Sequence, residues 1–440
     1  MEKMKIVDCI PNGIVTLPPS KSLFHRALIC AALAGEGSII EAGGIISEDV
    51  EATLNCLGIM GLQYRHESNR LKIIKGVDIP ANSVCTFTQS KILNCGESGS
   101  TLRFIIPLTL LTGEKVMITG GDRLMERPIA DYISALEANG GEIGFDGKSL
   151  QLQGNITPGT FVLPGDVSSQ YVSGLLMALP LLNGDSEIIL TSELESKPYV
   201  DLTLHVMNRF GVNVEAVGNT GYKIRGGQRY VPGKYMIEGD WSAAAFFLVA
   251  GALGCKVGCK GLNIDSLQGD KTILQIIEKC GGSITVDEEG CIYATANEIS
   301  PIEMDVRDFP DLVPPLAVLL CFCEGVSRIY GAKRLRLKES DRLHALTVLL
   351  NGMGADITEG DDCLIIKGVK RLKGGTVEPS NDHRIAMALA IASIKSERPV
   401  TTLNADCVNK SYPDFWNDFC ILKKEFYKEK KNEQYLGKQY

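Results

Sequence analysis

The chain has 440 residues, a formal net charge of −8 at pH 7 and a hydrophobic fraction of 45%. Its length allows about three domains, and its composition is that of an ordinary soluble globular protein. The acidic balance argues against a general binder of nucleic acid or anionic membranes, so any cationic site must be local.

The sequence carries no sign of export or membrane insertion. No segment approaches the ~18 uninterrupted apolar residues of a spanning helix, and Met1–Gly13 lacks the apolar run of a signal peptide. We therefore expect a cytoplasmic protein whose 14 cysteines are reduced thiols. Cys255 and Cys259 come nearest to a metal-binding pair, but no second Cys/His pair accompanies them. We expect neither a metal nor another cofactor.

One order of elements recurs six times along the chain. The first repeat reads as a helix from Ser22 to Ala32, a turn at Gly35, a strand around Ile39 and a second helix from Ser47 to Met60. The first helices of the later repeats are predicted at Arg103–Leu111, Gln170–Leu182, Trp241–Leu253, Asp311–Cys323 and Asp382–Ile394. Their second helices are predicted at Arg127–Ala138, Pro198–Phe210 and Asp270–Cys280, near Arg342 to Met353, and from Pro413 onward.

The spacing of the turns indicates duplication of one α/β unit. The turns at Gly35, Gly113, Gly184, Gly254, Gly325 and Ser396 are 78, 71, 70, 71 and 71 residues apart. Short β-rich runs lie between the repeats and predict further strands. Six repeats grouped as three and three predict an α/β fold with two similar domains that meet near Glu238–Asp240, in preference to one continuous array.

Cations occur at a predicted helix start, where they are unfavourable. Lys338–Arg342 run into an apolar stripe that ends at Gly354, which places them at a helix N-terminus. A helix N-terminus favours acids and opposes cations by up to ~1 kcal/mol. Lys338 and Arg342 therefore indicate a bound anion, and the alternative is a solvated helix start of mixed charge.

The same arrangement recurs at other predicted helix starts. It is seen at Ser20–Ser22 with Arg26, Ser98–Thr101 with Arg103, Arg127, Ser168–Gln170, Lys197 with Tyr199, Asp240 with Ser242, Asp311, Asp382–Arg384 and Lys410. If equivalent helices have equivalent orientations, these ends converge between the domains. A site with about seven cations, several hydroxyls and few carboxylates suits a small polyanionic substrate. Each serine alone is usually only an N-cap, and Gly96–Thr101 lacks the lysine of a P-loop.

These motifs, in this order, resemble those of the enolpyruvyl transferases. The shared motifs are Pro18-Pro19-Ser20-Lys21-Ser22 with Arg26, Ser98-Gly99-Ser100-Thr101-Leu102-Arg103, Glu126-Arg127-Pro128, Ser168-Ser169-Gln170, Glu238-Gly239-Asp240, Lys338-Glu339-Ser340-Asp341-Arg342 and Asn381-Asp382-His383-Arg384. The resemblance extends to about Phe419 and fits the branch that acts on shikimate 3-phosphate.

The resemblance implies a metal-free, monomeric, cytosolic enzyme of the shikimate pathway, which leads to chorismate and the aromatic amino acids. It implies an inside-out α/β barrel fold with two three-repeat domains. One domain would comprise residues 21–238, and the other residues 1–20 with 239–422. The active site would lie in the cleft between them. Independently of the resemblance, residues 423–440 are rich in Lys and Glu without an apolar stripe, so we expect a charged tail without function.

The resemblance also implies residue roles in the transfer of an enolpyruvyl group from phosphoenolpyruvate to the 5-hydroxyl of shikimate 3-phosphate. The implied shikimate 3-phosphate ligands are Lys21, Ser22, Arg26, Ser168, Ser169, Gln170, Ser196, Tyr199, Asp311 and Lys338. The implied phosphoenolpyruvate ligands are Lys21, Gly99, Arg127, Gln170, Arg342, Arg384 and Lys410. Asp311, Glu339 and Lys21 are the implied catalytic residues, with the two carboxylates transferring protons. Glyphosate would occupy the phosphoenolpyruvate site.

Three positions depart from the pattern, and two alternative functions remain. Arg334, Glu97 and Phe104 stand where many relatives have Asn, Asn and Pro. The branch that acts on UDP-N-acetylglucosamine typically carries a reactive Cys in the loop that here reads Gly120-Gly121-Asp122. A non-catalytic binder of a phosphorylated metabolite would keep the cations but leave Asp311 and Glu339 without a task.

Overall fold

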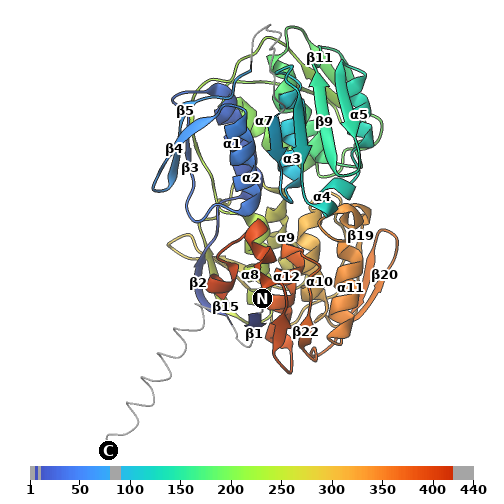
Figure 1. Ribbon diagram of the computed structural model, residues 1–440. Coiled ribbons are helices and arrows are strands. Elements are labelled where there is room, and N and C mark those ends of the chain that lie inside the picture. The colour runs from blue at the N-terminus through green and yellow to red at the C-terminus, as the bar shows by residue number, and fades with distance from the viewer. Residues whose placement is uncertain (1–4, 8–10, 80–90, 420–440) are drawn as a thin grey trace, which may run out of the picture. The chain divides into compact units, whose positions relative to one another are not determined.

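The computed structural model describes residues 5–7, 11–79 and 91–419 (Figure 1). The chain divides into an N-terminal unit, Pro19–Ile237, and a C-terminal unit that combines residues up to Pro18 with those from Glu238 onward. The predicted tail at 423–440 lies outside the described residues. Within the described ranges, no helix has the length and apolarity that a membrane crossing requires.

Three largely buried helices form the middle of the N-terminal unit. They are α1 (Lys21–Ala34), α3 (Gly99–Thr109) and α6 (Ser169–Ala178). Their sequences are apolar on nearly all sides, as expected for helices that are covered all round. Beside them pack α2 (Glu48–Ile59), α4 (Asp122–Glu126), α5 (Ala130–Glu137), the 3-10 helix η1 (Leu179–Leu181) and α7 (Lys197–Arg209).

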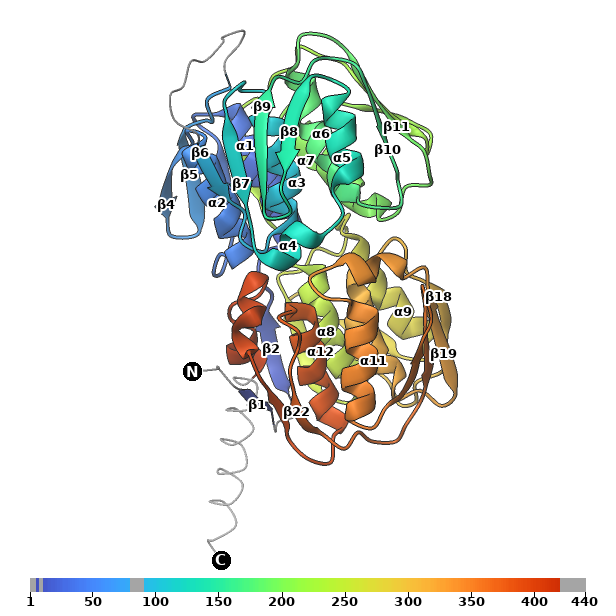
Figure 2. The same cartoon turned by 45° about the vertical axis from the view of Figure 1, so that its right-hand side comes forward.

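Among the described residues of this unit, three four-stranded sheets are formed, and they lie outside these helices (Figures 1 and 2). Their strand orders are β14 (Lys234–Met236), β3 (Ile39–Glu41), β5 (Arg70–Lys75), β4 (Gln63–Glu67); β6 (Lys91–Asn94), β7 (Val116–Thr119), β9 (Ser149–Gly154), β8 (Gly141–Phe145); and β10 (Thr160–Leu163), β11 (Ser186–Leu190), β13 (Gly221–Ile224), β12 (Glu215–Val217). In each sheet the first pair is parallel and the other two are antiparallel. Because β14 follows the third repeat but pairs with β3 of the first, it closes the set of three.

The C-terminal unit repeats this plan. Its middle holds α8 (Trp241–Ala252), α10 (Val313–Leu320) and α12 (His383–Ala392), with α9 (Ile273–Lys279) and α11 (Arg342–Gly352) beside them. Every residue of α8 is buried. The connecting 3-10 helices are η2 (Gly269–Thr272), η3 (Pro310–Leu312), η4 (Lys333–Leu337), η5 (Ser393–Lys395) and η6 (Ala405–Lys410).

The sheets of the C-terminal unit have the same pairing order. They are β2 (Asn12–Thr16), β15 (Lys256–Lys260), β17 (Ile292–Thr295), β16 (Ser283–Val286); β18 (Glu303–Asp305), β19 (Val326–Tyr330), β21 (Leu364–Lys367), β20 (Asp356–Glu359); and β22 (Gly375–Val377), β23 (Val400–Thr402), β1 (Lys5–Val7). Strand β2, from the beginning of the chain, pairs in parallel with β15. The first strands of the protein therefore belong to its C-terminal unit.

Four predicted helix starts are displaced in the structure. The helix predicted from Arg103 begins at Gly99. The helix predicted from Asp270 begins with the 3-10 turn η2 and becomes an α-helix only at Ile273. The helix predicted from Arg127 begins at Ala130, and Arg127 itself has extended dihedrals, φ −68° and ψ 142°. Pro128 explains this difference, because the residue before a proline is sterically disfavoured in helical conformation. The helix predicted from Asp311 begins with the 3-10 turn η3 and becomes an α-helix only at Val313.

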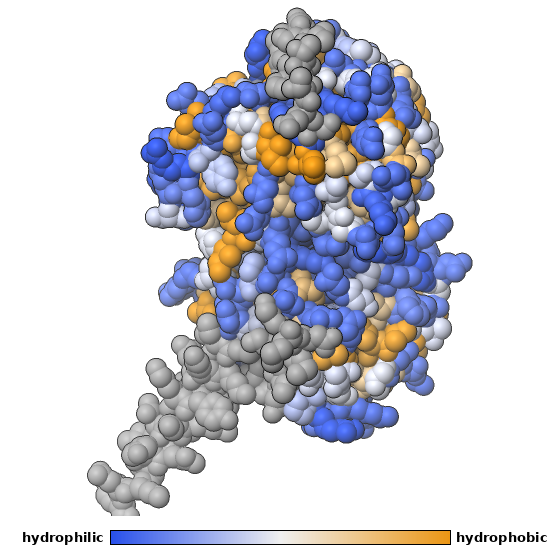
Figure 3. Space-filling view, viewed as in Figure 1, coloured by the Kyte–Doolittle hydropathy of each residue, from blue (hydrophilic) through white to orange (hydrophobic). Residues whose placement is uncertain are grey.

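The outer faces of the sheets carry scattered apolar residues. Ile92, Val162 and Ile189 are exposed on β6, β10 and β11, because alternate side chains of a strand must point outward. On the face shown in Figure 3, hydrophobic residues form separate groups among hydrophilic ones. Such exposure is ordinary for a folded protein.

Candidate active site

Lys21 is the first residue of α1 and is held by a carboxylate from α2. Its Nζ donates to Oδ2 of Asp49 at 2.6 Å, and the two side chains are 15% and 9% exposed. A cation at a helix start opposes the helix dipole, and Asp49 offsets this effect. The pair fixes Lys21 at the end of α1 where the helix N–H groups are unpaired.

Arg26 ties α1 to α7. Its Nε donates to Oγ1 of Thr203 at 2.7 Å, and its Nη2 donates to the carbonyl oxygen of Tyr199 at 2.9 Å. Its guanidinium carbon lies 5.2 Å from the ring centre of Phe104, which gives the unusual Phe104 a cation–π role. Burial lowers the pKa of Arg26 to about 10, so it remains a cation at neutral pH. Arg26 thus brings the predicted ligand Tyr199 close to α1.

Arg127 lies directly over the start of α3. A Cβ on Gly99 would stand 2.7 Å from Nη1 of Arg127, so only glycine allows this approach. The turn after Arg127 is fixed from α3 and α6, because Arg103 donates to the carbonyl oxygen of Pro128 at 3.4 Å and Tyr171 donates to the same oxygen. Gly99 and Arg127, two residues predicted to bind phosphoenolpyruvate, are therefore adjacent in the N-terminal unit.

The starts of α3, α6 and α7 present the remaining predicted ligands of this unit. Ser168 caps α6 by accepting from the N–H of Gln170 at 3.3 Å, and Gln170 Nε2 donates to Oγ of Ser100 on α3 at 3.1 Å. Ser196 precedes α7 in a left-handed conformation, with φ 55°. A non-glycine residue there costs on the order of 1 kcal/mol or more and is typical of functional sites. Gln170 joins the starts of α6 and α3, and Arg26 donates both to Ser22 of α1 and to Tyr199 of α7. Within each of these two pairs, the helix starts therefore lie at the same end of the unit.

In the C-terminal unit, Arg342 is the centre of a charged cluster. Its Nε donates to Asp382 Oδ2 at 2.8 Å, its Nη1 to Asp311 Oδ1 at 2.9 Å and its Nη2 to Glu339 Oε2 at 2.7 Å. Its side chain is 1% exposed. Burial by itself lowers the pKa of Arg342, but the carboxylates of Asp382, Glu339 and Asp311 outweigh burial and raise it. The cation that opposes the dipole of α11 is thus compensated by acids.

Asp311 is shared among several cations. Its Oδ2 accepts from Arg384 Nη2 at 2.8 Å, and Lys338 Nζ lies 3.8 Å from its Oδ1. Burial raises the pKa of Asp311, but Arg384, Lys338 and Arg342 outweigh burial and hold the pKa well below its ordinary value of 3.8. Asp311 is therefore a carboxylate at neutral pH.

A strained turn holds Lys410. Ser380 and Asn381 both have left-handed dihedrals, with φ 52° and 53°, and Lys410 Nζ donates to the carbonyl oxygen of Asn381 at 2.7 Å. Asp382 follows and caps α12 by accepting from the N–H of Arg384 at 2.9 Å. The turn brings Lys410 to the start of the helix that carries Arg384.

Several contacts of the site were not predicted. Asp49 and Thr203 hold Lys21 and Arg26, but acids in the first turn of a helix and a single Thr are too common to signal such roles. Glu97 packs against Gly121, where a Cβ would overlap it. Arg334 donates to the carbonyl oxygen of Arg307 at 2.9 Å. Among the described residues, no group of three or more His, Cys, Asp or Glu could hold a metal ion.

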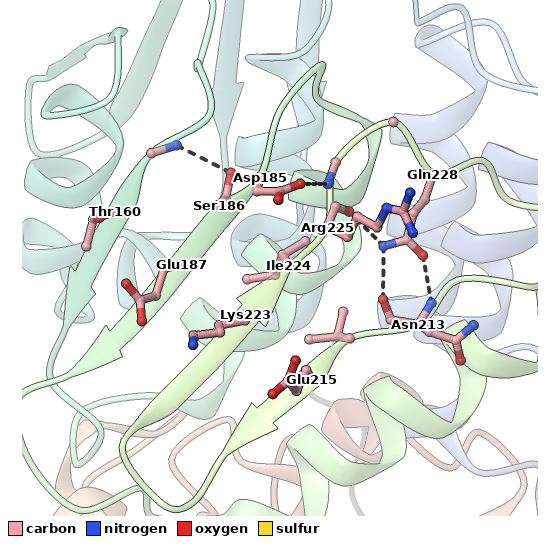
Figure 4. Close-up of a pocket in the computed structure, with 14 residues that line it drawn as sticks. Thr160, Asp185, Ser186, Glu187, Asn213, Glu215, Lys223, Ile224, Arg225 and Gln228 are labelled. Carbon is pink, nitrogen blue, oxygen red and sulfur yellow. Dashed lines mark hydrogen bonds between the residues drawn. The ribbon is translucent and has the colours of Figure 1, made fainter.

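A cavity of about 960 Å³ lies away from these motifs, on the outer face of the sheet that contains β11 and β13 (Figure 4). Lys223 on β13 is in register with Glu187 and Glu215 on the two neighbouring strands. Such cross-strand charges stabilise a sheet surface. None of the predicted site residues lines the cavity, and we assign it no function.

Comparison with known proteins places the chain in one family. A family model described as EPSP synthase (3-phosphoshikimate 1-carboxyvinyltransferase) matches residues 11–419. A 3-phosphoshikimate 1-carboxyvinyltransferase of Clostridium novyi (strain NT) is 45% identical over 428 residues, 95% of this chain and 97% of the relative. One from Clostridium acetobutylicum is 43% identical over 426 residues, 95% of this chain and 96% of the relative.

Solved structures confirm the predicted α/β fold class. An EPSP synthase structure from Acinetobacter baumannii superposes with a TM-score of 0.76 at 24% identity, covering 97% of this chain and 98% of that chain. A second structure from the same organism has a TM-score of 0.74 at 25% identity, covering 94% and 96%. From the match over residues 11–419 and the identity to curated relatives, the chain belongs to the EPSP synthase (3-phosphoshikimate 1-carboxyvinyltransferase) family.

Proposed function

We propose that this protein transfers the enolpyruvyl group of phosphoenolpyruvate to the 5-hydroxyl of shikimate 3-phosphate and releases phosphate. Family membership supports the reaction. The observation that carries the chemistry is the pair of carboxylates, Asp311 and Glu339, that share the guanidinium of Arg342. A protein that only bound an anion would use these two acids solely to compensate the buried guanidinium of Arg342, so the loss of turnover in their amide variants distinguishes the two functions.

The reaction needs one proton removed and one delivered. The 5-hydroxyl loses its proton as its oxygen bonds to C2 of phosphoenolpyruvate, while C3 gains a proton and becomes a methyl group. The resulting tetrahedral intermediate then loses the C3 proton and expels phosphate, which restores the double bond. Asp311, which is ionised, accepts the hydroxyl proton, and Glu339 exchanges the proton at C3.

The cations bind the anionic groups of the substrates. Arg127, Arg342, Arg384 and Lys410 hold the phosphate and carboxylate of phosphoenolpyruvate through charge-assisted hydrogen bonds. Lys21 serves both substrates. Arg384 is bonded to Asp311, so an anion that binds Arg384 draws this cation away from Asp311 and makes that carboxylate a better base.

The hydroxyl-rich segments of the N-terminal unit hold shikimate 3-phosphate. Ser22, Ser168, Ser169, Ser196 and Tyr199 bind the ring hydroxyls and phosphate, and Arg26, Gln170, Lys338 and Asp311 complete the ligand set. Glyphosate, as an anion, occupies the phosphoenolpyruvate site. The resemblance further leads us to propose a monomeric, cytoplasmic enzyme.

Phosphate release tests the function directly. The protein with both substrates is expected to release one phosphate per phosphoenolpyruvate consumed, and none when shikimate 3-phosphate is omitted. Phosphate release that depends instead on UDP-N-acetylglucosamine would support the alternative function, enolpyruvyl transfer to that acceptor. No release with either acceptor, together with measurable binding, would support a non-catalytic binder.

Lys338 should make substrate binding weaken at alkaline pH. Burial lowers the pKa of Lys338 to about 8, although the charge of Asp311 opposes this shift. A group that must be protonated and has this pKa gives a KM for shikimate 3-phosphate about tenfold higher at pH 9 than at low pH. Lys338→Arg stays charged, so its KM should be nearly constant from pH 7 to 9.

Stability measurements separate the rise in KM for shikimate 3-phosphate at alkaline pH from unfolding of the protein. Because the folded pKa of Lys338 lies below its ordinary value of 10.5, the unfolded chain binds more protons between pH 8 and 10.5. The contribution of Lys338 to stability therefore increases with pH in that window. An equal rise in KM for wild type and Lys338→Arg would contradict the assignment.

Gly99→Ala should weaken phosphoenolpyruvate binding selectively. The added Cβ would stand 2.7 Å from Arg127 Nη1 and must displace that guanidinium. We expect the KM for phosphoenolpyruvate to rise roughly tenfold, the size of one charge-assisted hydrogen bond, with little change in affinity for shikimate 3-phosphate. Gly58→Ala is the control, because a Cβ there would meet nothing within 4 Å. An unchanged KM in Gly99→Ala would mean that phosphoenolpyruvate binding does not depend on the position of the Arg127 guanidinium over Gly99.

A further inference from the structure

His25 is a buried group on α1 to which the proposed mechanism gives no role. It lies between the two cations Lys21 and Arg26 in sequence and is 0% exposed. Its Nδ1 lies 2.8 Å from Oγ1 of Thr53 on α2. Burial, together with the charges of Lys21 and Arg26, holds the pKa of His25 well below 6.5. The imidazole is therefore neutral and carries one proton.

A chain of hydroxyl groups continues from His25 to the start of α3. Thr53 Oγ1 lies 2.6 Å from Thr101 Oγ1, and Thr101 Oγ1 donates to Ser98 Oγ at 2.7 Å. Each of these side chains is 0% exposed, like His25. The chain therefore crosses from α1 through α2 to the N-cap of α3 without contact with solvent.

The hydrogen bonds of this chain run in one direction. The single hydroxyl hydrogen of Thr101 goes to Ser98 Oγ or to the carbonyl oxygen of Asp49, at 2.7 and 3.3 Å. Thr101 must then accept from Thr53, and Thr53 must accept from Nδ1–H of His25. The opposite direction would place the proton on Nε2 of His25, which has no hydrogen-bond partner among the described residues. A buried N–H without an acceptor is costly, so the Nδ1–H tautomer is favoured.

Both ends of the chain carry residues of the proposed active site. At one end, α1 presents Lys21 and Arg26, and Asp49 of α2 holds Lys21 at 2.6 Å. At the other end, Ser98 immediately precedes Gly99, over which Arg127 lies. The hydroxyl chain is thus a fixed connection, inside the N-terminal unit, between ligands of the two substrates.

We propose that His25 is a positioning residue that acts through Thr53 and Thr101 to fix the Gly99 turn relative to the start of α1. It touches neither substrate. It holds the Gly99 turn and Arg127 in the geometry that receives phosphoenolpyruvate once shikimate 3-phosphate occupies α1. The inference rests on the proposed function and assigns a task to three residues outside the ligand set.

Variants at Thr53 test the connection through kinetics. Thr53→Val keeps the shape of the side chain but removes its hydroxyl, whereas Thr53→Ser keeps the hydroxyl. We expect Thr53→Val to raise the KM for phosphoenolpyruvate roughly tenfold, since it leaves buried partners unpaired. Affinity for shikimate 3-phosphate alone should change less than about twofold, and Thr53→Ser should restore the wild-type KM.

Thr109→Val is the matched control. Thr109 is a buried threonine of α3 whose hydroxyl donates only within its own helix, to the carbonyl oxygen of Ile106 at 2.7 Å. A merely structural role would make Thr53→Val and Thr109→Val alike, with lower stability and unchanged KM. That result would overturn the proposal, as would equal loss of both substrate affinities in Thr53→Val. Because wild-type turnover is measured first, failure of the proposed reaction is recognised separately.

Nitrogen-15 NMR of the wild-type protein tests the direction of the chain independently of activity. The chain has five histidines, so the His25 signal is assigned by its absence in His25→Gln. We expect the neutral Nδ1–H tautomer, without titration between about pH 5.5 and 8. An Nε2–H tautomer, or titration in that range, would contradict the proposed role.

Discussion

Glu339→Gln and Asp311→Asn are each expected to lower kcat by ~10²-fold or more while shikimate 3-phosphate still binds, as is typical of positioned proton-transfer groups. Both amides keep the size and some of the hydrogen bonds of the acid but neither accepts nor delivers the proton. Because Asp311 is shared by Arg342, Arg384 and Lys338, its amide variant should also lose some stability at neutral pH. Single-turnover phosphate release, calorimetric binding and thermal unfolding measure the three quantities.

Glu303→Gln provides the control for this prediction. Glu303 is an acid of the same unit, 61% exposed and paired with Arg328 at 3.2 Å, and exposed pairs contribute little. It should change neither turnover nor binding. If Glu339→Gln lost shikimate 3-phosphate binding as severely as turnover, Glu339 would be a binding group and the proton would need another donor.

Asp382→Ala is expected to destabilise the C-terminal unit by about 3–5 kcal/mol, as is usual when one partner of a buried charge pair is removed. Asp382 is 0% exposed and accepts from Arg342 Nε at 2.8 Å, Ser340 Oγ at 3.0 Å and the N–H of Arg384 at 2.9 Å. Its loss would leave the buried guanidinium of Arg342 with less compensation. Total stabilities are usually about 5–15 kcal/mol, so this loss would be a large fraction.

Urea unfolding of Asp382→Ala is best compared with that of Asp341→Ala. Asp341 also caps a helix of this unit, α11, but its side chain is 37% exposed, so its removal should cost about 1 kcal/mol. Asp382→Asn should lie between the two. Equal losses in the two alanine variants would mean that Asp382 acts only as a helix cap.

Arg342 shows what sequence reasoning captured and what it missed. Its unfavourable place at a helix start indicates a functional segment, because helix ends can be predicted from local periodicity. The interpretation was incomplete, because in the structure Asp382, 40 residues away in sequence, bonds to it directly. A contact between residues so far apart in sequence depends on the packing of α11 against α12, which local sequence patterns do not predict.

Arg127 and Phe104 show two other limits. The apolar pattern after Arg127 predicts a helix that begins before Pro128. The sequence alone argues against this start, because proline disfavours helical conformation in the residue before it. Phe104 was recognised only as a departure from the family pattern, and its position over Arg26 depends on how α1 and α3 pack. The fold class, by contrast, followed from repeats long enough for periodicity to be reliable.

The pairing of β2 with β15 affects the order in which the protein can fold during synthesis. Residues 12–16 leave the ribosome well before their partners, residues 256–260, which are made about 240 residues later. At 5–20 residues per second, as is usual for translation, this delay lasts roughly 12–50 s. The N-terminal unit ends at Ile237, so the strands of its sheets are all made before residues 256–260. It can therefore fold while β2 still has no partner strand. During this delay the nascent chain carries an unpaired β-strand before a folded unit. An unpaired strand can aggregate or bind chaperones.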